Sequence, residues 1–201
     1  SYSALDVEAF RESGISATYV PMGFDHLLEF PTLPFAPEIT HIGARYPKRQ
    51  AMIEGLYGRG FRVKTYGRDW SHDVRDRLRT WGGDRPDVPS GRDLDRAHAY
   101  ATMRDSLATL NIHGDQDGFT MRTFEAAGAG AVQLCDRADV AEAYEPGREI
   151  LTFSSVDEAR EHISKIQADP RWAESIRTEA RRRTLAEHTL VHRARAIQEL
   201  W

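Results

Sequence analysis

Hydrophobic and polar positions alternate along this chain with two different periods. Short apolar runs between glycines, prolines and polar residues predict buried strands over residues 38–42, 62–66, 108–112, 131–135 and 150–153. Apolar residues spaced three or four apart predict helices over residues 48–57, 74–81, 94–106, 120–127, 138–145, 155–168 and 172–201, the last broken near His188 and Thr189. The alternation predicts an α/β fold, a doubly wound parallel sheet with helices on both faces.

This topology also predicts where a ligand would bind. In open parallel sheets, ligands lie beyond the carboxyl ends of the strands. The loops that follow Ile42, Tyr66 and Ile112 are therefore the first places to look for a site. The region 70–91 is expected to be a polar loop around its short helix.

The first 36 residues are organised differently. Residues 5–13 predict a short helix and residues 17–20 a strand. Four prolines and a glycine from Pro21 to Pro37 exclude a helix or a central strand and predict an extended linker. We therefore expect a domain boundary, with residues 1–36 as the end of an N-terminal domain plus the linker and residues 37–201 as the main domain.

Composition and charge narrow the class of protein. Hydrophobic residues make up 40% of the 201 and charged residues 29%, which is typical of a folded globular chain and excludes collagen-like and disordered classes. No apolar run is long enough to predict a membrane span, and the N-terminus lacks the pattern of a signal peptide. The single cysteine, Cys135, excludes an internal disulfide and suits a cytoplasmic protein. A net charge of −4 disfavours nucleic acid as a partner.

Residues 111–132 carry the clearest chemistry. A strand end, an acidic loop with glycines and a helix start follow one another there. The backbone N–H groups of Phe119, Thr120 and Met121 would face an anion at the helix N-terminus, for which phosphate is the natural guest. Glu125 lies about one and a half turns into this helix among apolar and small residues. Its carboxylate needs a partner, which is either the two hydroxyls of a ribose or a salt-bridging side chain.

The same residues resemble a known donor-site signature. In retaining GT-B glycosyltransferases, two acidic residues are separated by seven others, and Asp117 and Glu125 have that separation. The sequences MRTFEAAGAG at 121–130, YEPGREIL at 144–151 and EHTLVHR at 187–193 are more closely similar to the group 1 glycosyltransferase C-terminal domain of spore-maturation (CgeB-like) proteins. The resemblance covers roughly residues 37–200. It implies a Rossmann-like domain, the C-terminal half of a GT-B glycosyltransferase, that binds a nucleotide-sugar.

The resemblance also implies roles for residues at matching positions. Glu125 would bind the ribose of the donor, and Asp117 would bind a sugar hydroxyl. Gly118, Phe119 and Thr120 would offer backbone N–H groups to the sugar or the phosphate. The family has Glu at position 117 and Gly at position 120, so this chain departs from the pattern at the sugar contacts.

Further donor contacts are expected around this signature. Arg122 belongs to the CgeB-like motif and would contact the diphosphate or orient the loop, and His113 would make a polar contact to the sugar or phosphate. The loop around Gly43, with Arg45 and Arg49 after it, resembles the glycosyltransferase loop that faces the donor diphosphate. Guanidinium groups suit that role because they stay charged and can donate hydrogen bonds to two phosphate oxygens at once. The alternative is that these cations form a solvated helix N-terminus.

Other candidate sites are weaker. Asp115 and Asp117 match the Asp-x-Asp motif of metal-dependent glycosyltransferases. That motif belongs to a different fold, so we expect no metal. His188 and His192 are four residues apart without a third zinc ligand nearby, which favours capping or core histidines. Cys135, in a predicted strand, is expected to be a core thiol.

The sequence therefore predicts a glycosyltransferase, hexosyltransferase-like, that transfers a sugar from a nucleoside-diphosphate sugar without a cofactor. Retention of configuration and independence from metal are implied by the resemblance. In this interpretation, the chain is part of a longer protein, and its partner is a missing N-terminal GT-B domain. The alternative is a non-catalytic Rossmann-like module that binds a nucleotide or another protein.

Overall fold

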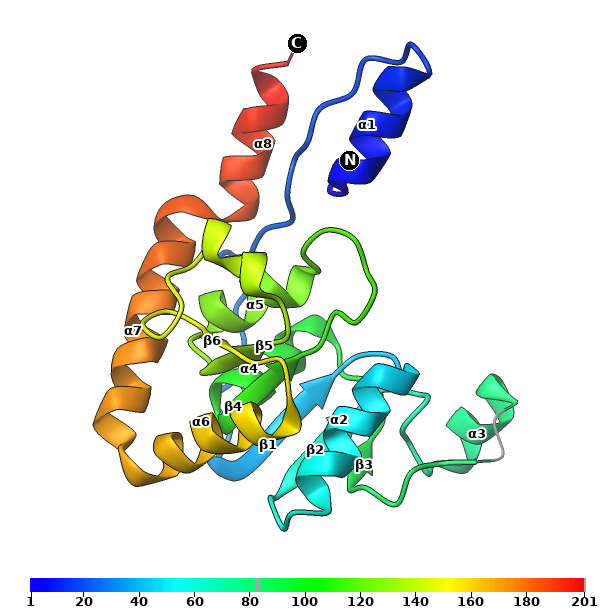
Figure 1. The fold of residues 1–201 in the computed structure, drawn as a ribbon, viewed down its shortest axis with the longest axis vertical. Helices are drawn as coiled ribbons and strands as arrows, with labels where there is room; N and C mark the ends of the chain where they lie inside the picture. Colours follow the sequence, from blue (N-terminus) through cyan, green and yellow to red (C-terminus); the bar gives the residue numbers. More distant parts are fainter. Residues whose placement is uncertain (82–83, 201) are drawn as a thin grey trace.

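The computed structural model describes residues 1–81 and 84–200. Its centre is a six-stranded sheet in the order β3-β2-β1-β4-β5-β6, in which every neighbouring pair is parallel (Figure 1). The strands are β1 Ala36–Ile42, β2 Val63–Tyr66, β3 Ser90–Gly91, β4 Ser106–Asn111, β5 Gln133–Cys135 and β6 Leu151–Thr152. This order reverses direction between β1 and β4, where the Rossmann-type fold places its ligand.

Helices cover both faces of the sheet, as predicted. The helices are α1 Ala4–Glu12, α2 Pro47–Tyr57, α3 Val74–Thr80, α4 Arg96–Arg104, α5 Met121–Ala129, α6 Val156–Ala168, α7 Pro170–Glu187 and α8 Leu190–Gln198. One buried cluster joins α2 and α6 to the sheet through residues such as Ile53 and Ile163. A second cluster joins α4 and α5 to the opposite face through residues such as Tyr100 and Phe124. The predicted doubly wound α/β fold is therefore confirmed.

Most predicted elements match the observed ones within a few residues, and the differences have local causes. The two-residue strand β3 lies inside the predicted 70–91 loop, because Thr65 and Tyr66 of β2 pair with Ser90 and Gly91. Residues 138–145 contain only a short 3₁₀ helix, Ala138–Glu142. Residues 82–83 of the predicted loop and Trp201 at the end of the predicted last helix lie outside the described residues.

The predicted strand over residues 17–20 is wrong. Its backbone pairs with the first residue of the chain instead of with a strand, because Val20 N–H donates to the Ser1 carbonyl at 2.9 Å and the Ser1 amino group donates to the Thr18 carbonyl at 3.0 Å. Without a neighbouring strand, this β-prone sequence stays extended.

The predicted linker 21–37 is confirmed only in part. Residues 25–35 form neither helix nor strand, but Ala36 and Pro37 begin β1, a central strand between β2 and β4. The register of β1 against β4 shifts between Ala36 and Ile39, which accommodates a proline that has no N–H to donate. Whether the segment links two domains stays a prediction.

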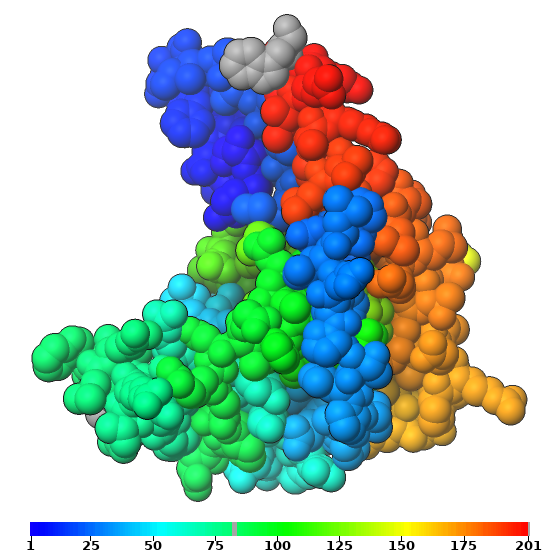
Figure 2. Space-filling model, turned by 180° about the vertical axis from the view of Figure 1, so that it is seen from behind, coloured from blue at the N-terminus to red at the C-terminus, as the bar shows by residue number. Residues whose placement is uncertain are grey.

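The two ends of the chain lie side by side beyond the sheet. Figure 2 shows the N-terminal segment in blue next to the C-terminal helix in red. A bridge between Phe24 and Thr189 joins the two segments at their base. Among the described residues, no helix is both long and apolar enough to cross a membrane.

Candidate functional site

The carboxyl ends of β1, β2, β4 and β5 meet at one edge of the sheet. Ile42 pairs with Tyr66 at the ends of β1 and β2, and Asn111 pairs with Cys135 at the ends of β4 and β5. The loops that follow these strands therefore share one edge. All the predicted site residues lie in these loops or in the first two turns of α2 and α5.

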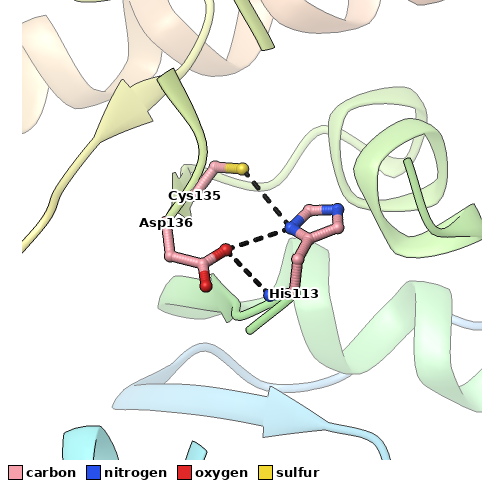
Figure 3. A group of neighbouring side chains, drawn as sticks. All are labelled: His113, Cys135 and Asp136. Atoms are coloured by element: carbon pink, nitrogen blue, oxygen red, sulfur yellow. Dashed lines mark hydrogen bonds and ion pairs between the residues drawn. The ribbon is translucent and has the colours of Figure 1, made fainter. Parts of the chain in front are cut away.

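His113 follows β4, and its imidazole is buried. Figure 3 shows the ring with its Nδ1 facing Asp136 and Cys135. Its Nδ1 is 3.1 Å from Oδ1 of Asp136, which also accepts the His113 N–H at 2.8 Å, while Oδ2 accepts the Gly114 N–H at 2.9 Å. Because a carboxylate only accepts, Nδ1 carries the proton and Nε2 is an acceptor. Nε2 lies 3.2 Å from the Thr123 hydroxyl and 3.4 Å from the Thr120 N–H. His113 thus connects the end of β5 to the first turn of α5.

His113, Cys135 and Asp136 could in principle hold a metal ion, since their ligand atoms lie within 4.8 Å of one another. The hydrogen bonds above already engage the imidazole and the carboxylate. Burial raises the pKa of the Cys135 thiol to about 12, so without a metal the sulfur keeps its proton near neutral pH. This cluster therefore fits a structural network better than a metal centre. Cys135 is buried in the core, as predicted.

The two acidic residues of the loop face different partners. Asp115 pairs with Lys48 of α2. Asp117 accepts the Ser3 hydroxyl at 2.5 Å and the Leu5 N–H at 3.4 Å, so its carboxylate lies at the N-terminus of α1. The hydrogen bond from Ser3 is the main reason why the pKa of Asp117 lies below its ordinary value.

Backbone geometry fixes the loop between these residues and α5. Gly118 has φ +70°, and a Cβ placed on it would lie 2.6 Å from the Tyr2 carbonyl oxygen. Arg137 donates to the carbonyls of Gln116 and Gly118 at 3.0 and 2.8 Å and stacks on Phe119. The residues that precede α5 are therefore held against the N-terminal segment of the chain.

Glu125 is buried, with 2% of its surface exposed. Arg122 forms an ion pair with its Oε2, and Oε1 accepts the Tyr100 hydroxyl at 3.3 Å and lies 3.5 Å from Nε of Arg96. Burial, assisted by the Glu125 carboxylate, raises the pKa of Tyr100, which keeps the hydroxyl a donor. Arg122 also donates from Nε to the Ile42 carbonyl at 3.3 Å. It therefore connects Glu125 to the end of β1.

The two arginines after Gly43 differ in environment. Arg45 is half-buried and donates to the Gln50 side chain at 3.4 Å. Arg49 is buried and donates to the carbonyls of Ile112 and Ala44 at 2.6 and 3.0 Å and to Gln116 at 3.1 Å. These bonds use three of the five N–H groups of its guanidinium. Arg49 therefore holds the β4 loop, a contact that the sequence pattern did not indicate.

Three cavities open at this edge of the sheet. The first, about 500 Å³, lies between α1 and the start of α5 and is lined by Tyr2, Ser3, Asp6, Met22, Gln116, Asp117, Thr120, Met121, Arg122 and Glu125. The second, about 430 Å³, follows β1 to β3 and is lined by residues that include Gly43, Gly67, Arg68, Asp93 and Arg122. The third, about 500 Å³, is lined by residues that include Tyr46, Lys48, Arg49, His113 and Gln116. Arg122 borders the first and second cavities, and Gln116 the first and third.

Sequence reasoning missed several residues of this edge. Arg96 and Tyr100 reach Glu125 from α4, and Ser3 and Asp6 line the first cavity from the N-terminal segment. Only Asp136 had a local signal, since it follows a predicted strand directly and so belongs to the same edge. His188 and His192 cap helices, as predicted: His188 ends α7, and His192 completes a capping box with Thr189.

Comparison with known proteins agrees with this architecture. A family model described as glycosyl transferase-like matches residues 48–199. No curated protein matches the chain in sequence.

Several solved structures are similar in fold at low sequence identity. Sucrose-phosphate synthase from Thermosynechococcus elongatus is 17% identical with a TM-score of 0.70, over 98% of this chain and 56% of the other. Anabaena HepE in complex with UDP and glucose is 16% identical with a TM-score of 0.75, over 100% of this chain and 61% of the other. The glucosyltransferase of phage T4 in complex with UDP-glucose is 12% identical with a TM-score of 0.65, over 98% and 59%. This chain thus spans about three fifths of these proteins.

Proposed function

The chain belongs to the glycosyl transferase-like family, and we propose that it binds a nucleoside-diphosphate sugar as the C-terminal, donor-binding half of a GT-B glycosyltransferase. The position of Glu125 carries the proposal. A buried carboxylate one and a half turns into α5, beside the cavity at the carboxyl edge, is suited to the two hydroxyls of a ribose. Its oxygens offer about four acceptor positions, and Arg122, Arg96 and Tyr100 account for three, so the second ribose hydroxyl would have to replace one of these partners.

The neighbouring groups would bind the rest of the donor. The N-terminus of α5, with the backbone N–H groups of Phe119 and Met121, would offer donors and the positive end of a helix dipole to a phosphate. The Thr120 N–H, also expected there, is already engaged by Nε2 of His113. Asp117 would bind a sugar hydroxyl in place of the Ser3 hydroxyl, from which it accepts a hydrogen bond in this structure. His113 would act through Thr120 and not by touching the donor, because both of its ring nitrogens are already hydrogen-bonded, to Asp136 and to Thr120 and Thr123.

Catalysis would come mainly from electrostatic stabilisation of the leaving group. When the bond between the anomeric carbon and the diphosphate breaks, negative charge grows on the β-phosphate, and the sugar becomes oxocarbenium-like. Arg45, Arg49 and the α5 N-terminus would stabilise that charge without a metal. Arg122 would contribute a further positive charge beside Gly43.

Finer features of the proposal rest on the sequence resemblance. These are a retaining outcome, a hexose as the transferred sugar, membership of the spore-maturation subfamily and an N-terminal GT-B domain as the partner that supplies the acceptor site. Uridine diphosphate is the first nucleotide to test, because two of the similar structures contain UDP-glucose or UDP.

One observation favours the alternative, a non-catalytic nucleotide-binding module. The Arg49 guanidinium donates to two backbone carbonyls and to Gln116, so it is used to hold the loop. If Arg49 has only this role, the chain binds a nucleotide without activating its departure. Release of nucleoside diphosphate from the bound donor by the longest available form of the protein distinguishes the two functions.

The experiment that tests donor binding is a thermal-shift panel. It compares each nucleoside, nucleoside diphosphate and nucleoside-diphosphate sugar, with a chelator or with Mn²⁺. A true ligand at about 100 times its Kd adds ~2.7 kcal/mol of stability. At about 2–4 °C per kcal/mol for a domain of this size, the melting temperature should rise by several degrees.

We expect one diphosphate and its sugar to shift the melting temperature, the parent nucleoside to shift it far less, and the chelator to change nothing. Donor binding would be contradicted if no compound in the panel raised the melting temperature. Binding that requires Mn²⁺ would overturn the metal-free mechanism and would favour Asp115 and Asp117 as metal ligands.

A further inference from the structure

Arg137 lies two residues after β5 and reaches across to the loop that precedes α5. Its Nη1 donates to two backbone carbonyls of that loop, to Gln116 at 3.0 Å and to Gly118 at 2.8 Å. The guanidinium carbon lies 4.8 Å from the centroid of the Phe119 ring. In the described chain, residues 114–119 make one backbone-to-backbone hydrogen bond, at 3.4 Å. Arg137 therefore supplies support that secondary structure does not supply here.

Asp139 fixes the orientation of the guanidinium. Its Oδ1 accepts from Nε of Arg137 at 2.9 Å, and its Oδ2 accepts from Nη2. Asp139 and the two carbonyls together use four of the five guanidinium N–H groups. All of these partners belong to the protein, so Arg137 is placed to hold the loop and not to touch a ligand.

The contact with Gly118 sets the direction of the next N–H group. In a planar trans peptide, the C=O and the N–H of one unit point in opposite directions. Because the Gly118 carbonyl faces Arg137, the Phe119 N–H faces away from it, and this N–H has no acceptor among the described residues. The proposed function assigns the Phe119 N–H to a phosphate of the donor. Arg137 therefore aims a group that the donor would use.

We propose that Arg137 is a positioning residue for the donor diphosphate, a role that rests on the proposed function. In this structure the loop is held on one side by Ser3, which donates to Asp117, and on the other side by Arg137. A donor hydroxyl that replaces Ser3 removes the first of these contacts. Arg137 then keeps the Phe119 N–H directed at the phosphate, so the donor has less of the loop to order when it binds.

Arg104 offers a matched control at the opposite edge of the sheet. It ends α4, just before β4 begins. Its Nε and Nη2 donate to the two carboxylate oxygens of Asp105 at 2.8 and 2.7 Å, and Nη2 also donates to the Pro31 carbonyl at 2.8 Å. Its guanidinium carbon lies 4.9 Å from the centroid of the Phe30 ring. Arg104 thus has the same kinds of partner as Arg137, but it holds the segment before β1.

Calorimetric titration with a diphosphate and with its nucleoside tests the role. The probes are UDP and uridine, or the pair that the thermal-shift panel selects in their place. We expect Arg137→Met to weaken diphosphate binding about tenfold, as for the loss of one hydrogen bond to a charged group. Nucleoside binding should stay unchanged, because Arg137 acts through the N–H that faces the phosphate.

Two further variants make the result specific. Arg104→Met should bind both compounds like the wild type, even where it lowers the melting temperature as much as Arg137→Met does. Asp139→Asn weakens the orientation of the guanidinium without removing it, and should weaken diphosphate binding in the same direction. It replaces Arg137→Met if circular dichroism shows that Arg137→Met is not folded.

A folded Arg137→Met that binds the diphosphate as tightly as the wild type would overturn the positioning role and leave the proposed function intact. An equal loss for Arg104→Met, or an equal loss for the nucleoside, would also overturn it, because the effect would then not act through the phosphate. A wild-type chain that binds no diphosphate would instead contradict the proposed function, and this inference with it.

Discussion

His113 illustrates how burial changes the role of a polar residue at a strand end. Its position after β4 predicts a contact with a ligand, but the structure places the imidazole between Asp136 and the first turn of α5. The protonated Nδ1 fixes Nε2 as an acceptor for the Thr120 N–H and the Thr123 hydroxyl. The residue therefore positions the helix N-terminus that would receive a phosphate.

Asp136 should contribute stability that depends on pH. Burial opposes its ionisation, but the hydrogen bonds from His113 and Gly114 outweigh burial and hold the pKa of Asp136 below its ordinary value. A lowered pKa stabilises the fold above the unfolded value of about 3.9, and this contribution is lost as the pH falls through the folded pKa. Asp136→Asn should therefore cost ~1–3 kcal/mol at pH 7.

Urea unfolding from pH 7 downward measures this effect. The difference between Asp136→Asn and the wild type should narrow below about pH 3.9. Asp157→Asn, at an exposed acid with surface ion pairs, is the control and should change stability by less than about 0.5 kcal/mol. A difference that is absent at pH 7, or that is constant down to acid pH, would disprove the role of Asp136.

The sequence predicts the setting of Glu125 but not its partners. Apolar and small neighbours predict that its carboxylate lies at a packed seam, and a salt bridge was one of the two partners expected. Arg122, one turn earlier, is in reach by helical spacing. Arg96 and Tyr100 approach from α4, and no local sequence pattern predicts which faces of α4 and α5 pack together.

At the scale of elements, α1 and the loop before α5 form one unit. Asp117 accepts from Ser3 and Leu5 at the start of α1, and Gly118 leaves room for the Tyr2 carbonyl. The N-terminal segment thereby supplies one wall of the first cavity. A donor that engages Asp117 would compete with Ser3, so donor binding and the position of α1 should be coupled.

Two glycine substitutions test how closely α1 packs on this loop. Gly60 has φ +86°, and a Cβ added to it would meet no atom within 4 Å, so Gly60→Ala should cost only the left-handed backbone energy, ~1–2 kcal/mol. Gly118→Ala adds a clash with the Tyr2 carbonyl and should cost at least ~1 kcal/mol more.

Chemical denaturation measures both variants, and limited proteolysis follows the N-terminal segment. Gly118→Ala should be cleaved faster than Gly60→Ala within residues 1–20, because relief of the clash moves α1 away. Equal stability and equal cleavage of the two variants would mean that α1 does not pack on the loop.

Strands whose own residues have high β propensity and that lie at the centre of the sheet were predicted well, and segments whose structure is decided by their neighbours were not. The runs at 38–42 and 108–112 are strands because β1 and β4 pair at the centre of the sheet. Residues 17–20 have similar β propensity but meet only Ser1, so they form no strand. Ser90 and Gly91 have little propensity, yet they form β3 because β2 lies alongside.

At the scale of the whole molecule, the strand order brings the site together. The loops that carry Gly43, His113 and Asp136 meet at one edge, because all the strands are parallel and the strand order reverses between β1 and β4. Parallel alternation predicts this edge, but it does not predict that the N-terminal segment would cover part of it. The family match over residues 48–199 includes Arg49, Asp117 and Glu125.

The proposed binding of a nucleoside-diphosphate sugar beside Glu125 is tested most directly by calorimetric titration of the preferred diphosphate. Glu125→Gln keeps the shape of the side chain but removes its charge, and should weaken binding by ~1.5–3 kcal/mol, about tenfold to a hundredfold. Glu149→Gln is the matched control, because Glu149 is equally buried and paired with Arg183 outside the three cavities. Folded Glu125→Gln that binds as tightly as the wild type, or an equal loss for Glu149→Gln, would contradict the account.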